Sequence, residues 1–163
     1  AKAFFDAQAA HIEPILEKEK TGLSVAFFAV ASDGTITVRK PNDYVSSMIE
    51  LAGGTYSLNG YVPEEENALS TLKMQMEDFY AAEKDADILI YNGTIEGELT
   101  SIDELVQKNS LFADFKAVKT GQVYTTGSNF YQQTSGTCDF IEDLNKVLNG
   151  ETDAEYRFLK KIN

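Results

Sequence analysis

The chain has 163 residues, a length that fits one ordinary domain, and 26 Asp and Glu against 14 Lys and Arg give it a formal charge of −12. With 43% hydrophobic residues it can build a packed core, which excludes intrinsic disorder as its main description. The acidic field disfavours a nucleic-acid partner, and a single cysteine, Cys138, excludes an internal disulfide.

The N-terminal part of the chain carries one helical and two extended patterns. Apolar residues at helical spacing predict an amphipathic helix over 2–20, which Pro14 should kink. A continuous apolar run over 23–31 predicts a strand that is buried on both faces. The β-branched residues over 35–38 follow a turn signal and predict a second, shorter extended segment.

The rest of the chain alternates helices with strands. The predicted elements are a helix from the N-cap Asn42 to Leu51, a helix over 72–84, a strand over 88–91, a helix capped by Ser101 and Glu104, a strand over 122–126, a helix over 134–148 and a short helix around 156–159. Such alternation predicts an α/β fold, a three-layer α/β/α sandwich with a mostly parallel central sheet. Ligands gather at the carboxyl ends of the strands in such sheets, here near Ser32, Asn92 and Thr126.

The residues form no convincing catalytic site and no motif for a bound cofactor. Neither a P-loop nor a dinucleotide-binding glycine pattern occurs, and the glycines at 53–54 follow a helix as a C-cap would. Cys138 lies at helical spacing with apolar residues, so we interpret it as an inert core thiol and not as a nucleophile beside His11. The acidic run over 64–66 is typical of solvated surface more than of a cation site.

Two groups of residues favour ligand binding instead. Arg39 and Lys40 place positive charge at the rim of the predicted cleft, where an anionic ligand would be attracted, although a solvated turn explains the pair equally well. Tyrosines at strand ends can stack on a planar ligand and still donate a hydrogen bond, while ordinary packing is the alternative for each of them alone. This polar and aromatic set comprises Tyr44, Tyr91, Asn92, Tyr131, Gln132 and Gln133.

Three segments, in order, resemble the C-terminal lobe of ABC-transporter substrate-binding proteins for ferric siderophores, haem and cobalamin. They are LAGG at 51–54, DADILI at 85–90 and FKAVKTGQVY at 115–124, which match a helix-terminal Gly-Gly and two strand entries, "dPDvIi" and "l.AVknGrVy". The resemblance covers nearly all of the chain. It implies a two-lobed protein that holds its ligand between the lobes, with 1–20 as the end of the interlobe helix and 21–163 as the C-terminal lobe.

The resemblance also implies partners and site residues. It implies no enzymatic activity and no cofactor, but a metal-chelate cargo, an ABC permease with its ATPase, a missing N-terminal lobe, and an extracytoplasmic location with a lipoprotein signal outside this sequence. Glu77 best matches the glutamate that docks on the permease, with 64–66 as substitutes because Ala86 replaces the usual proline. The implied ligand-binding residues are Arg39, Lys40, Tyr44, Asn92, Glu96 and Tyr131.

The cargo is ranked by the chemistry of these residues. Arg39 and Lys40 suit an anionic ferric siderophore or the propionates of haem, whereas Tyr44 or Tyr131 could ligate iron or stack on a porphyrin or corrin. We therefore place iron chelates first, haem second and corrinoids third. One alternative is a flavodoxin-like or sugar-nucleotide enzyme domain, in which perturbed acid or base groups should converge in a pocket. Another is an interaction domain that works through its acidic surface.

Overall fold

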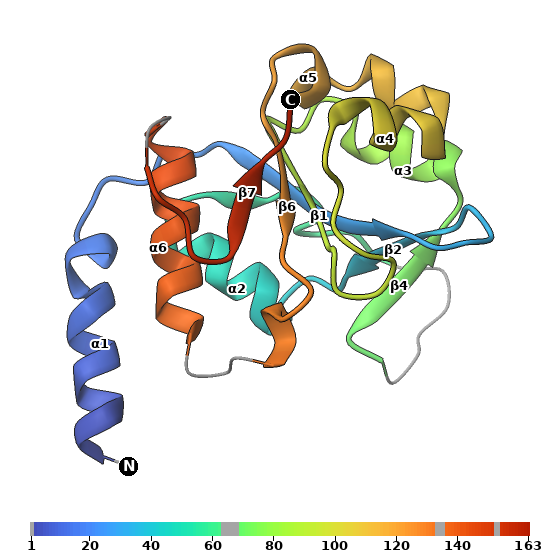
Figure 1. Ribbon diagram of the computed structural model, residues 1–163. Coiled ribbons are helices and arrows are strands. Elements are labelled where there is room, and N and C mark those ends of the chain that lie inside the picture. Colours follow the sequence, from blue (N-terminus) through green and yellow to red (C-terminus); the bar gives the residue numbers. More distant parts are fainter. Residues whose placement is uncertain (1, 63–68, 133–135, 152–153) are drawn as a thin grey trace.

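The computed structural model describes residues 2–62, 69–132, 136–151 and 154–163 (Figure 1). In chain order the elements are α1 (Lys2–Leu16), β1 (Ser24–Val30), β2 (Ile36–Arg39), α2 (Tyr44–Leu51), β3 (Thr55–Tyr56), β4 (Thr71–Met74), α3 (Met76–Glu83), β5 (Ile88–Tyr91), α4 (Ile102–Lys108), the 3-10 helix η1 (Ser110–Asp114), α5 (Lys116–Lys119), β6 (Val123–Thr126), the 3-10 helix η2 (Phe130–Gln132), α6 (Thr137–Leu148) and β7 (Leu159–Lys161).

The described strands form one mixed sheet of seven, in the order β4-β2-β1-β5-β6-β7, with β3 paired to β1. β1 runs parallel to β3 and β5, and β5 runs parallel to β6. β2 is antiparallel to both β1 and β4, and β7 is antiparallel to β6. Five strands therefore point one way and only β2 and β7 oppose them, which confirms the expected α/β class with a mostly parallel sheet.

Helices cover both faces of the sheet, α2 and α6 on one side and α3, α4 and α5 on the other (Figure 1). α1 lies outside α6 and packs against it, so it forms a further partial layer on that side. None of the helices in the described ranges combines the length and the apolar character needed to cross a bilayer.

β1 joins the two halves of the core because its successive side chains point to opposite faces of the sheet. The Phe28 ring stacks on Phe112 with centroids 5.4 Å apart, on the side of α3 and η1. The neighbouring Phe27 ring lies 6.0 Å from Phe130, whose ring in turn lies 4.5 Å from Phe140 of α6. Val25 to Val30 are all buried, so the predicted doubly buried strand is confirmed.

One predicted helix begins too early, because the helix over 72–84 is found only as α3, and one predicted element has the wrong type. Leu72 was expected to begin a helix, but Leu72 and Met74 are buried on either side of the exposed Lys73, the two-residue period of a strand, and β4 pairs with β2. The C-terminal segment around 156–159 was expected to be a short helix, yet Leu159 pairs with Thr126 in the ladder between β6 and β7. In both cases pairing with a neighbouring strand outweighs the local pattern.

Two further helix boundaries differ from the predictions, and a third falls outside the described residues. α1 ends at Leu16 and not at residue 20. The N-cap of α2 is Asp43, whose carboxylate accepts a hydrogen bond from the Val45 amide, whereas Asn42 takes a left-handed conformation with φ 63°. α6 begins at Thr137, and the predicted start at 134 lies outside the described residues. The predicted cap at Ser101 is confirmed, because its hydroxyl accepts a hydrogen bond from the Glu104 amide.

Candidate functional site

Arg39, at the end of β2, lies at the centre of a polar and aromatic cluster. Its guanidinium forms a two-pronged ion pair with Asp43, with Nε 2.8 Å from Oδ1 and Nη2 2.6 Å from Oδ2. Arg39 is 8% exposed, and the side chain of Asp43 is 4% exposed. The backbone carbonyl of Arg39 accepts a hydrogen bond of 2.7 Å from the Tyr56 hydroxyl, which fixes the end of the strand. The guanidinium that we expected to bind an anionic ligand therefore forms an ion pair with a carboxylate of the protein itself.

Two tyrosines flank this guanidinium. The Cζ atom of Arg39 lies 5.0 Å from the ring centroid of Tyr44 and 5.9 Å from that of Tyr131. The two rings meet edge to face with centroids 6.4 Å apart. Asn92, which follows β5, donates from Nδ2 to the Tyr131 hydroxyl at 3.1 Å. We refer to Arg39, Asp43, Tyr44, Asn92 and Tyr131 as the aromatic cluster.

The connections between elements bring the aromatic cluster together. Tyr44 begins α2 directly after the β2–α2 connection, Asn92 follows β5, and Tyr131 lies in η2, the first helical turn after β6. Asn92 and the segment after Thr126 thus meet at the ends of two neighbouring parallel strands, as the strand-end rule predicts. Ser32, the third predicted position, lies in the tight turn that follows the carboxyl end of β1, which runs parallel to β5, but it is not part of the aromatic cluster.

The tyrosines of the cluster remain partly open to solvent, with Tyr44 51% and Tyr131 38% exposed. Burial, followed by the neighbouring Tyr131, raises the pKa of Tyr44 to about 12. Burial also raises the pKa of Tyr131. Both phenols are therefore protonated at neutral pH, and each offers a ring face and a hydroxyl to a ligand.

A small pocket adjoins the aromatic cluster. Its volume is about 90 Å³, and it is lined by Tyr44, Met48, Phe130, Tyr131, Gly136, Thr137, Phe140 and Phe158. Pockets that enclose a drug-sized ligand measure about 300–1,000 Å³. This pocket can take the edge of a ligand, while the rest of such a ligand would lie over the exposed rings.

The other predicted site residues lie outside this cluster. Lys40 follows Arg39 and is half-buried, whereas Glu96 lines a separate open pocket of about 360 Å³ with Glu98 and Lys108. Glu77 is exposed in the first turn of α3, and its docking role stays a prediction. The alternatives over 64–66, and Gln133 of the polar set, lie outside the described residues, and only the backbone of Gln132 is described. Tyr91 is buried, and its hydroxyl has no hydrogen-bond partner among the described residues.

Sequence reasoning missed Asp43, which neutralises Arg39. Its signal was available, since a carboxylate four residues after an arginine and directly before a helix can act as both ion-pair partner and N-cap. The sequence predicts the other members of the cluster as ligand-binding residues, but their mutual contacts depend on how β5, β6 and α2 pack.

Solved structures with the same fold identify the architecture around this cluster. The TroA-like periplasmic binding protein FepB from Veillonella parvula matches with a TM-score of 0.68 and 14% identity, over 99% of this chain and 56% of that one. The siderophore periplasmic binding protein from the fuscachelin gene cluster of Thermobifida fusca matches with a TM-score of 0.65 and 18% identity, over 92% and 54% of the two chains. The chain has the fold of one lobe of a substrate-binding protein.

A haem-binding protein of known structure has the same fold. The periplasmic haem-binding protein HutB of Vibrio cholerae matches with a TM-score of 0.65 and 13% identity, over 93% of this chain and 56% of that one. The chain thus spans about half the length of these substrate-binding proteins. Comparison with models of known protein families finds no match, and neither does comparison with the sequences of curated proteins.

Proposed function

We propose that this chain is the C-terminal lobe of the solute-binding component of an ABC importer. The observation that carries the proposal is the aromatic cluster: Tyr44 and Tyr131 are half open at one edge of a lobe whose adjoining pocket of about 90 Å³ is too small to enclose a ligand. Such a surface suits a ligand that is held between two lobes. The similar structures support the proposal, since their chains are about twice as long as this one.

The proposed division places residues 1–20 at the end of the interlobe helix and 21–163 in the lobe itself. α1 supports this arrangement, because its N-terminal end extends past the body of the molecule on the side where η2 lies (Figure 1). The proposed partners are the missing N-terminal lobe and an ABC permease with its ATPase. The proposed location is extracytoplasmic, held there by a lipid anchor.

The proposed cargo is a ferric siderophore first, haem second and a corrinoid third. The two protonated tyrosines favour stacking and hydrogen bonding to the organic part of a chelate, such as a catecholate ring or a porphyrin. The guanidinium of Arg39 lies over both rings and polarises them. Among similar structures, one is named for a siderophore and another for haem.

The proposed function is not enzymatic. An enzyme domain should bring acid or base groups with shifted pKa values together in a pocket. Burial raises the pKa of Glu83 to about 7, but this residue is only 1% exposed at the end of α3 and does not line the pocket beside the aromatic cluster. The geometry of Arg39 and Asp43 is that of a structural ion pair.

Truncation of either tyrosine should weaken cargo binding in the two-lobed protein. We expect Tyr44→Ala and Tyr131→Ala each to lower the affinity for a ferric siderophore or haem about 2- to 10-fold, because each removes one stacking ring. Quenching of tyrosine fluorescence during titration measures the affinity. Tyr80→Ala, on the opposite face of the sheet in α3, is the matched control. If both variants bind every chelate tested with unchanged affinity, the two tyrosines are not part of the binding site.

Glu77 should act in delivery of the cargo and not in its capture. We expect Glu77→Ala to leave cargo affinity unchanged but to slow uptake into cells several-fold, because the lost charge would face basic residues of the permease. Radiolabelled iron uptake and a binding titration on the same variant separate the two steps. Asp103→Ala, an exposed acid in the first turn of α4, is the control. Weaker binding with normal uptake would remove Glu77 from the docking surface.

A further inference from the structure

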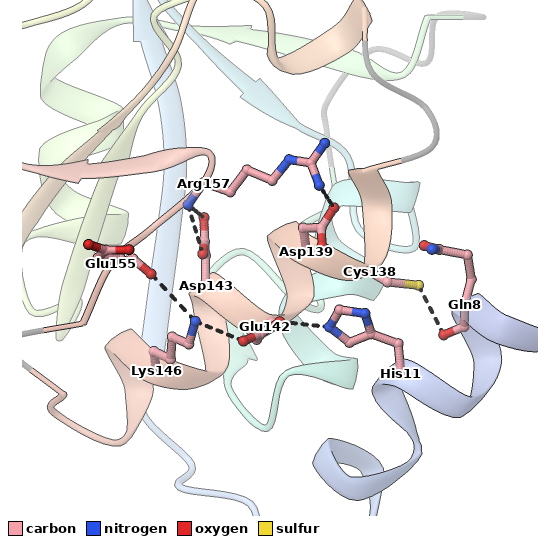
Figure 2. Close-up of polar contacts among 9 residues, drawn as sticks. All are labelled: Gln8, His11, Cys138, Asp139, Glu142, Asp143, Lys146, Glu155 and Arg157. Atoms are coloured by element: carbon pink, nitrogen blue, oxygen red, sulfur yellow. Dashed lines mark hydrogen bonds and ion pairs between the residues drawn. The ribbon is translucent and has the colours of Figure 1, made fainter.

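A second group of polar residues lies where α1 packs against α6, apart from the aromatic cluster (Figure 2). His11 projects from α1, while Asp139 and Glu142 lie three residues apart and so share one face of α6. The Nε2 atom of His11 is 2.6 Å from Oε2 of Glu142. One possible ligand atom from each of the three residues lies within 4.8 Å of the other two, the only such group of three among the described residues.

We propose that His11, Asp139 and Glu142 bind a divalent transition-metal ion of the Zn²⁺ type. One imidazole nitrogen and two carboxylate oxygens are ligands that zinc accepts, and a water molecule can complete the tetrahedron. Metal–ligand distances of about 2.0–2.2 Å place tetrahedral ligand atoms about 3.4 Å apart. The three side chains are 20–36% exposed, so small torsional changes can bring their atoms to this spacing while the helices stay in place.

The carboxylates are already oriented by neighbouring cations. Lys146 contacts Oε1 of Glu142 at 2.8 Å, which leaves Oε2 on the side of His11. Arg157 contacts Oδ2 of Asp139, and its own backbone amide is held by Asp143 (Figure 2). Partners of this kind fix the direction of a metal ligand. Their positive charges also oppose a cation, so the geometry points to moderate affinity.

Space for the remaining ligand lies next to the group. A pocket of about 260 Å³ borders His11, Glu142 and Lys146, and it is large enough for water molecules that complete the coordination. Cys138 is close in sequence to Asp139, but its thiol donates to the Gln8 carbonyl at 3.4 Å and is not needed as a ligand. A bound ion would connect α1 to α6 at a point where one hydrogen bond between His11 and Glu142 now connects them.

The test is a calorimetric titration of the metal-free protein with Zn²⁺ alone. We expect one zinc per chain, and His11→Ala and Asp139→Asn should each weaken its binding about 10-fold or more. Glu13→Gln, which removes an exposed acid from the same helix, is the matched control and should change nothing. Co²⁺ should give visible absorption bands in the parent protein that His11→Ala abolishes.

One variant separates a metal site from a plain network of ion pairs. Lys146→Gln should tighten zinc binding several-fold, because glutamine removes the positive charge while its amide group can still donate to Glu142 and keep its direction. The proposal is overturned if zinc does not bind, if His11→Ala and Asp139→Asn leave its affinity unchanged, or if Lys146→Gln weakens it. Tyr44→Ala should not affect zinc binding, so the outcome is independent of the cargo site.

Discussion

Glu83→Gln is expected to raise the free energy of unfolding at pH 8 by about 3 kcal/mol. Glu83 ends α3, is 1% exposed, and neither carboxylate oxygen has a hydrogen-bond partner among the described residues. Burial raises its pKa to about 7, and the nearby Ser57 hydroxyl lowers it only in part. Folding above that pH must bury a charge, and glutamine removes this cost while it keeps the shape of the side chain.

The pH dependence has a definite sign. The folded state of the parent protein holds a proton that the unfolded state releases, so the stability from this group is present below about pH 4.5 and is lost as the pH rises through about 7. The difference between Glu83→Gln and the parent should therefore be small at pH 4.5 and reach its full size by pH 8. Urea unfolding at both pH values measures it, and Glu77→Gln, exposed on the same helix, is the control. Parallel pH profiles for the two proteins would show that Glu83 is not buried in this way.

Arg39→Met is expected to lower the free energy of unfolding by about 3–5 kcal/mol. The substitution leaves the carboxylate of Asp43 buried without its cation, and the side chain of Asp43 is only 4% exposed. Adding Asp43→Asn should recover most of the loss, because asparagine is neutral and can still cap α2 by accepting from the Val45 amide.

The comparison of the single and double variants tests this account. Thermal and urea unfolding measure the stability of both variants. If Arg39→Met lowers the free energy of unfolding by less than about 1 kcal/mol, Arg39 and Asp43 behave as a solvent-exposed ion pair. The result also affects binding studies. If the lobe binds the proposed cargo, a variant of Arg39 alone can lose it because the cluster collapses. The neutral double variant is therefore the better test of whether the guanidinium contributes to binding.

The sequence predicted the centre of the sheet because burial on both faces leaves a continuous apolar run, as in β1 and β5. It failed at β4 and β7, short strands at the two edges of the sheet, where Leu72 and Leu159 fit a helical pattern and a strand pattern equally well. Only the presence of β2 and β6 beside them decides the structure. Such pairing joins segments that are distant in the sequence, so the spacing of residues within one segment does not reveal it.

The candidate site could be predicted in part. The rule that ligands bind at strand ends predicts that Asn92 lies near the segment that contains Tyr131, and the two residues are hydrogen-bonded. The rule could not show that Asp43 forms an ion pair with Arg39, or that Glu96 lines a different pocket. Glu83 left a readable signal, since it lies seven residues after the buried Met76 and so on the apolar stripe of α3.

The engagement of Arg39 by Asp43 changes what the aromatic cluster can offer to a bound molecule. The ion pair carries no net charge, so its long-range pull on an anion is weak, and what remains is the polarised faces of Tyr44 and Tyr131. Ligand specificity at this edge would then depend on the shape and planarity of the ligand more than on its charge. Capture should accordingly change little between dilute and concentrated salt.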